Sequence, residues 1–122
     1  MARILVRQRD IVLVPFPFSD QSGKKVRPVV VVSNDTYNSS SDDVLVVGVT
    51  SNMTRDAYST LLSDDDLVEG KLLTRCVAKV ENILKIDKDI MIKRIGQINR
   101  KKLGSIREIL VRLVSEDAQK SF

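Results

Sequence analysis

The 122-residue sequence has no histidine and no tryptophan, and it has a single cysteine. Without histidine there is no imidazole to bind zinc or to activate a cysteine nucleophile, and no carboxylates stand at a recognisable ligand spacing, so the sequence argues against a metal hydrolase. Cys76 cannot form an internal disulfide, and it lies in an apolar-rich stretch. This favours a buried structural thiol in a reducing compartment. We therefore expect a cytoplasmic protein that uses no metal and no other cofactor.

Phosphate-binding loops and membrane segments are also missing from the sequence. No apolar run approaches the roughly 18 residues of a membrane span, and the basic N-terminal segment is not followed by the apolar core of a signal peptide. The glycines are too far apart for a P-loop or a dinucleotide-binding loop. They are Gly23, Gly48, Gly70, Gly96 and Gly104.

The charge balance is weakly positive. The chain carries 20 lysines and arginines against 16 aspartates and glutamates, a net charge of +4. This balance favours a polyanionic partner without requiring one. The length fits one domain with one substantial core, and no internal repeat or linker is visible, so we expect residues 1–122 to fold as a single domain.

Four consecutive valines, Val29–Val32, mark the centre of the fold. A strand exposed on one face would alternate apolar and polar residues, so this run predicts a strand buried on both faces. Arg27 and Pro28 stand at its entrance, where the proline keeps the backbone extended. The preceding strand, Ile11–Val14, is joined to it by the polar loop 19–25, and we predict that the two strands form a hairpin.

A second buried strand is predicted over Val44–Ser51, with Gly48 marking a bulge or a close backbone approach. Lys79 and Glu81 are predicted to share one face of a later strand, because side chains alternate along a strand. The later predicted strands are Ser59–Leu62, Leu72–Ile86 and Met91–Ile98.

The remaining segments are read as turns and one helix. Asp10 is predicted as a turn residue, and the Ser-, Asn- and Asp-rich stretch Asn34–Asp43 as a polar turn. From Leu103 to Val114 the apolar residues follow helical spacing, with Asn99 as the capping residue. These elements together predict a mainly β protein, a small and strongly curved β-barrel with a C-terminal amphipathic helix.

Polar residues at strand ends are the candidates for chemistry: Arg27, Thr50, Ser51, Lys79 and Glu81. Cleavage of RNA without metal needs little more than such groups, because the 2′-hydroxyl of the substrate is itself the nucleophile. The protein must take up the hydroxyl proton, stabilise charge on the phosphoryl oxygens and allow the leaving oxygen to be protonated. Spacing alone does not bring these residues together in space.

Three stretches carry a resemblance to a known family. They are DIVLVPFPFSDQSGKKVRPVVVVSND, VLVVGVTSN and AKVENILKIDK. Followed by the terminal helix, this order resembles the MazF/PemK family of toxin endoribonucleases over Asp10 to Val114. The resemblance implies an SH3-like barrel, a homodimer and a cognate antitoxin that neutralises it. It also implies metal-free cleavage of single-stranded RNA to a 2′,3′-cyclic phosphate and a 5′-hydroxyl.

The family pattern also suggests residue roles. Its Arg-Pro pair falls on Arg27-Pro28, whose guanidinium would stabilise the scissile phosphate, and its Thr-Ser pair on Thr50-Ser51. The family's Asp-Gln pair falls on Glu81-Asn82, and a general acid found in some members falls on Lys79. Both of these positions are substituted here. Further RNA-binding candidates are Ser51, Gln21, Ser22, Lys24, Lys25 and Arg75.

Two other classes of function stay open. One is a non-catalytic SH3-like module that binds RNA or an antitoxin, with cleavage lost through the substitutions at Glu81 and Lys79. The other is a DNA-binding or gyrase-directed toxin on the same barrel. The antitoxin implied by the resemblance would be an acidic, partly disordered segment.

Overall fold

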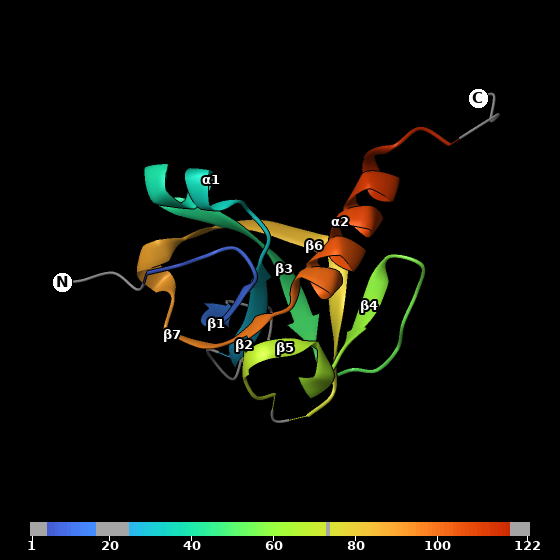
Figure 1. The fold of residues 1–122 in the computed structure, drawn as a ribbon, viewed down its shortest axis with the longest axis horizontal. Helices are drawn as coiled ribbons and strands as arrows, with labels where there is room; N and C mark the ends of the chain where they lie inside the picture. The colour runs from blue at the N-terminus through green and yellow to red at the C-terminus, as the bar shows by residue number, and fades with distance from the viewer. Residues whose placement is uncertain (1–4, 17–24, 73, 118–122) are drawn as a thin grey trace.

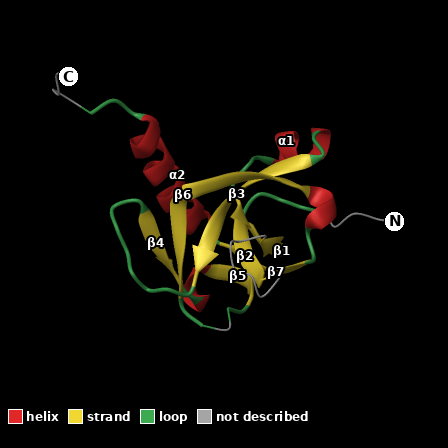
Figure 2. Cartoon of the chain, turned by 180° about the vertical axis from the view of Figure 1, so that it is seen from behind, coloured by secondary structure: helices red, strands yellow, loops and turns green. Residues whose placement is uncertain are grey.

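The computed structural model describes residues 5–16, 25–72 and 74–117. In these residues seven strands form one antiparallel sheet in the order β4-β6-β3-β2-β1-β7-β5. The strands are β1 (Asp10–Phe16), β2 (Lys25–Val31), β3 (Asp43–Thr50), β4 (Ser59–Leu62), β5 (Leu67–Gly70), β6 (Cys76–Asp87) and β7 (Lys93–Ile98). The helices are α1 (Asp35–Ser40) and α2 (Arg100–Val114), with short 3-10 turns η1 (Asp64–Asp66) and η2 (Lys88–Ile90). The sheet curls into a half-barrel, and α2 lies beside β4 and β6 (Figures 1 and 2). The predicted fold class is confirmed.

The valine strand lies in the middle of the sheet, between β1 and β3. Val29, Val30 and Val31 have no exposed surface, which confirms burial on both faces, whereas Val32 follows the end of β2 and is partly buried. β1 and β2 pair from Ile11 opposite Val30 onward and form the predicted hairpin. This position explains the unbroken apolar run, because each face of β2 contacts a separate part of the core.

Two apolar clusters lie on the two faces of the sheet, since alternate residues of each strand point to opposite sides. The first contains Ile11, Val30, Val47, Val49, Leu62, Cys76, Ala78, Val80 and Ile98, and helix α2 adds Ile106 and Ile109. The second contains Val6, Val12, Val14, Val29, Val31, Val44, Val46, Ile86 and Met91. Helix α2 thus covers the first cluster with the apolar stripe that its sequence predicts.

A bulge interrupts the pairing of β3 with β6. Val47 pairs with Ile83, but Gly48 pairs with Lys79, so residues 80–82 have no counterpart on β3. This confirms the prediction of an irregularity at Gly48. The bulge lies in β6, and it contains Glu81.

Helix α2 begins close to its predicted start. The Asn99 side chain accepts a hydrogen bond from the Lys102 backbone N–H at 2.8 Å, which confirms the predicted cap. No helix within the described ranges is long and apolar enough to span a membrane.

Four predictions differ from the structure, and one of them is the strand predicted over Met91–Ile98, which begins only at Lys93 because Met91 ends the turn η2. The segment Asn34–Asp43 contains helix α1, because Asn34 accepts from the Tyr37 N–H and serves as an N-cap, a role that the same residue types also favour. The strand predicted over Leu72–Ile86 begins only at Cys76. Asp10 does close a turn with Arg7, but it is also the fully buried first residue of β1.

Candidate active site

The strand register places Arg27, Thr50 and Lys79 on one face of the sheet. Val29 on β2 and Lys79 on β6 both lie opposite Gly48 on β3, and residues directly opposite each other in a sheet point to the same side. Arg27 and Thr50 are two residues from Val29 and Gly48, so they share that side. The same register, continued by two residues, sets Arg27 opposite Thr50. Because neighbouring strands lie about 4.8 Å apart, these side chains project from one compact region.

Asn82 belongs to the same region, although the sequence did not mark it as a site residue. A Cβ atom added to Gly48 would lie 2.6 Å from Nδ2 of Asn82, so the amide lies directly over this glycine. The glycine among valines is the sequence signal for such a close approach. The Asn82 side chain of the β6 bulge therefore lies over β3, the strand between β6, which carries Lys79, and β2, which carries Arg27.

Lys79 lies between two carboxylates. Its Nζ is 2.9 Å from Oδ2 of Asp56 and 3.6 Å from Oε2 of Glu81, which confirms that Lys79 and Glu81 share a face. The hydrogen bond from Lys79 is the main cause that lowers the pKa of Asp56, followed by the one from the Tyr58 N–H. The same bond raises the pKa of Lys79, with Glu81 adding to the effect. The ammonium and the Asp56 carboxylate are therefore both charged at neutral pH.

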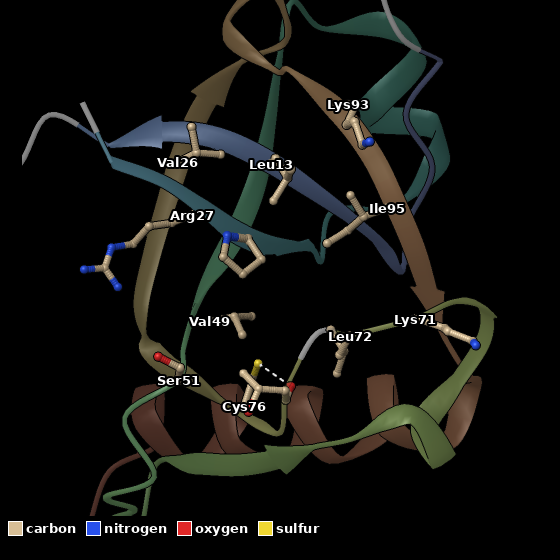
Figure 3. Close-up of a pocket in the computed structure, with 12 residues that line it drawn as sticks. Leu13, Val26, Arg27, Val49, Ser51, Lys71, Leu72, Cys76, Lys93 and Ile95 are labelled. Atoms are coloured by element: carbon tan, nitrogen blue, oxygen red, sulfur yellow. Dashed lines mark hydrogen bonds between the residues drawn. The ribbon is translucent and has the colours of Figure 1, made fainter. Parts of the chain in front are cut away.

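A cavity of about 660 Å³ opens next to this region (Figure 3). Its wall is mostly apolar, and the described residues that line it include three cations, Arg27, Lys71 and Lys93, and no carboxylate. Ser51 lies at its rim, and the Arg27 guanidinium points away from the apolar centre. The other lining residues are Leu13, Val26, Pro28, Val49, Leu72, Thr74, Cys76 and Ile95. The surroundings favour an anionic ligand with apolar parts.

The candidate residues thus divide into two groups. Arg27 and Ser51 line the cavity, whereas Thr50, Lys79 and Glu81 are not among its lining residues. Lys71 is a lining cation that the sequence did not single out.

The other RNA-binding candidates lie at an adjoining cavity or fall outside the described residues. Arg75 is exposed at a smaller cavity of about 190 Å³, which shares Leu72 and Thr74 with the larger one. Gln21, Ser22 and Lys24 fall outside the described residues, and so does the side chain of Lys25.

Cys76 is a buried residue of the cavity wall. Burial raises the pKa of its thiol, and Sγ donates a hydrogen bond to the Thr74 carbonyl oxygen at 3.2 Å. The thiol is therefore protonated, which agrees with the predicted structural role. Within the described ranges, no group of three histidine, cysteine, aspartate or glutamate residues could hold a metal ion.

Comparison with known proteins gives one matching family and many similar folds. A model of the family described as PemK-like, MazF-like toxin of type II toxin-antitoxin system matches residues 7–114. No curated protein sequence matches. An endoribonuclease in complex with its cognate antitoxin from a mycobacterial species superposes with a TM-score of 0.73 at 16% identity, covering 93% of this chain and 100% of the other. MazE-MazF from Deinococcus radiodurans superposes with a TM-score of 0.73 at 17% identity, covering 93% of this chain and 100% of the other. The Mycobacterium tuberculosis toxin MazF-mt6 superposes with a TM-score of 0.71 at 19% identity, covering 89% of this chain and 99% of the other.

Proposed function

Since this chain belongs to the family of PemK-like, MazF-like toxins of type II toxin-antitoxin systems, we propose that it is an endoribonuclease that cleaves single-stranded RNA without a metal ion. The observation that carries this proposal is the strand register that directs Arg27, Thr50 and Lys79 to one face. The ion pair between Lys79 and Glu81 adds a carboxylate to that face. Cation, hydroxyl and carboxylate are the groups that this reaction requires.

In the proposed reaction the 2′-oxygen of one ribose attacks the adjacent phosphorus. The Glu81 carboxylate takes the proton of the 2′-hydroxyl, the bond from this oxygen to phosphorus forms, and the bond from phosphorus to the 5′-oxygen breaks. The products are a 2′,3′-cyclic phosphate and, once the leaving oxygen is protonated, a 5′-hydroxyl.

Arg27 is the group that stabilises charge on the phosphoryl oxygens. Its planar guanidinium can donate two hydrogen bonds to one phosphate, and the Thr50 hydroxyl, which accepts from the Asn52 N–H at 3.1 Å, retains its own proton for a third. Lys71 and Lys93, at the same cavity as Arg27, are placed to attract the neighbouring phosphates of the strand.

The proposed partners follow from the family and the charge. A cognate antitoxin with an acidic segment would fit a protein of charge +4 and the three cations at the cavity. Two of the similar structures are described as complexes of this kind, an endoribonuclease with its cognate antitoxin and MazE-MazF. A homodimer and a cytoplasmic location are part of the same proposal.

The test is cleavage of end-labelled single-stranded RNA in the presence of EDTA. We expect discrete fragments with 2′,3′-cyclic phosphate and 5′-hydroxyl ends, and no cleavage of DNA of the same sequence, because DNA lacks the attacking hydroxyl. An RNA that is bound but stays whole would instead identify the non-catalytic module. Intact RNA together with inhibited DNA supercoiling would identify a gyrase-directed toxin.

Gly48→Ala should lower the rate of RNA cleavage strongly and the free energy of unfolding only a little. The added methyl group would push away the Asn82 amide, which follows Glu81 in the bulge, and a displacement of about 1 Å beside a reacting group can cost up to about 100-fold in rate. Single-turnover rates and urea unfolding of the same variant would measure the two effects separately.

Gly104→Ala is the matched control. A Cβ atom at Gly104 of α2 meets nothing closer than Nη2 of Arg107 at 3.9 Å, so this variant should cleave normally and gain about 0.5–1 kcal/mol of stability. Equal cleavage rates for Gly48→Ala and the unmodified protein would show that the bulge is not part of the active site.

A further inference from the structure

We propose that Lys79 is a positioning residue and not the general acid. Together with Arg112 of α2, it holds the loop of residues 51–58 in the orientation that receives RNA. The proposal rests on the proposed RNA cleavage, because the loop begins at Ser51 on the rim of the cavity.

The Asp56 carboxylate is the contact point between the loop and β6. Its Oδ2 accepts the hydrogen bond from Lys79 Nζ at 2.9 Å, and its Oδ1 accepts one from the Tyr58 N–H at 2.8 Å. The Asp56 N–H donates to Ser59 Oγ at 3.0 Å. One side chain therefore closes the turn that leads into β4 and fastens this turn to the strand that carries Glu81.

Helix α2 holds the other side of the same turn. Arg112 Nη2 donates a hydrogen bond to the Ala57 carbonyl oxygen at 2.9 Å, and its guanidinium carbon lies 5.6 Å from the centre of the Tyr58 ring. This distance is within the range of a cation–π contact. In Figures 1 and 2 the loop turns back beside α2 just before β4. The turn is thus fixed to two elements, β6 and α2, that lie far from it in the sequence.

Polar contacts are the main interactions that hold the loop of residues 51–58 in place. Every residue of the loop from 51 to 58 is exposed, and none belongs to either apolar cluster. A segment without buried apolar contacts opens easily when its polar contacts are removed. The Tyr58 carbonyl oxygen also accepts a backbone hydrogen bond from the Val80 N–H at 3.0 Å, which fixes the end of the loop to β6. Lys79 and Arg112 are therefore the side chains whose loss should loosen the loop before this point.

The surroundings of Lys79 also explain why it is a poor general acid. Its ammonium faces two carboxylates, at 2.9 and 3.6 Å, and a neutral amine would leave both of them without their counter-charge. A general acid works best when its proton is released near the operating pH. The leaving 5′-oxygen is then protonated by water.

Two measurements test this assignment in Lys79→Met, Asp56→Asn and Arg112→Met. Lys85→Met is the matched control, because Lys85 lies on the same strand and forms an exposed ion pair with Asp43 at 3.9 Å, away from the loop. The first measurement is hydrogen–deuterium exchange of the loop. We expect the three variants to exchange about twofold to fivefold faster over residues 51–58, because each exposed polar contact contributes little free energy. Lys85→Met should leave exchange unchanged.

The second measurement is cleavage of two RNAs that differ only in the leaving atom. One has the normal 5′-oxygen, and the other has sulfur at that position, which leaves as a thiolate and needs no general acid. We expect Lys79→Met and Asp56→Asn to raise KM by a similar factor for both RNAs. The double variant should be no worse than Lys79→Met alone, because the contact between Lys79 and Asp56 is already lost in that variant, whereas Lys79 also faces Glu81.

Normal cleavage of the sulfur RNA by Lys79→Met, with slow cleavage of the oxygen RNA, would identify Lys79 as the general acid and overturn the proposal. Unchanged exchange over residues 51–58 in the three variants would overturn it as well. If the unmodified protein cleaves neither RNA, the proposed function fails, and the exchange measurement still decides whether Lys79 holds the loop.

Discussion

Arg27→Ala is expected to reduce RNA cleavage at least about 100-fold and to leave the sheet folded. Removal of one group that stabilises charge in a transition state commonly costs about 100-fold to 1000-fold in rate. Arg27 shares a sheet face with Thr50, and it lines the cavity with its guanidinium directed away from the apolar centre. Its strand is held by Val29 to Val31, which the substitution does not change. The measurement is the single-turnover cleavage rate, with circular dichroism to verify the fold.

Two further variants show whether the loss comes from the shape of the guanidinium and whether it is specific to this arginine. Arg27→Lys keeps the charge but loses the planar guanidinium. Partial activity of this variant would assign the rest of the lost cleavage rate to the bidentate contact with the phosphate. Arg107→Ala removes an exposed arginine from α2 and should cleave at the normal rate. Equal rates for Arg27→Ala and the unmodified protein would exclude Arg27 from the site.

The sequence predicts the parts of this fold that depend on local patterns. Four consecutive valines indicate a strand buried on both faces, the helical spacing after Asn99 indicates α2, and Gly48 indicates the bulge. In each case the signal lies within a few residues of the feature it predicts, so composition and spacing are sufficient.

The contacts of the candidate site depend on residues far apart in the chain. Lys79 pairs with Asp56, 23 residues away, and Arg112 donates to the carbonyl oxygen of Ala57, 55 residues away. No periodicity encodes such pairs, so Lys79 could be matched to a general acid only by family resemblance. The same limit applies to Asn82, whose place over Gly48 depends on how β6 pairs with β3.

Asp10 shows why a local reading of a polar residue can be incomplete. Its position before a strand predicts a turn, and it does accept a hydrogen bond from the Arg7 N–H at 2.8 Å. The same carboxylate also accepts from Arg94 Nε at 2.8 Å and from Gln97 Nε2 at 3.1 Å, both on β7. Its side chain is 1% exposed. The contacts that make it structurally important are therefore with a strand more than 80 residues away.

Asp10→Ala is expected to lower the free energy of unfolding by about 3–5 kcal/mol. The substitution removes the buried acceptor that Arg94 Nε, the Gln97 amide and the Arg7 N–H share, and each buried donor left without an acceptor costs about 1–3 kcal/mol. Arg94 itself keeps Glu69 as a counter-charge. Urea unfolding followed by circular dichroism measures the change. RNA cleavage by the protein that remains folded should be normal, because Asp10 joins β1 to β7 and contacts none of the proposed catalytic residues.

The size of this effect depends on burial, and Glu69 provides the comparison. Glu69 also pairs with Arg94, at 2.7 Å, but its side chain is 57% exposed, so Glu69→Ala should cost at most about 1 kcal/mol. Replacing both residues, in Asp10→Ala combined with Arg94→Met, should recover part of the loss, because the Arg94 Nε group that has lost its buried acceptor is then removed as well. A double variant that is less stable than Asp10→Ala alone would mean that the Arg94 side chain stabilises β7 mainly through Glu69 and its aliphatic stem.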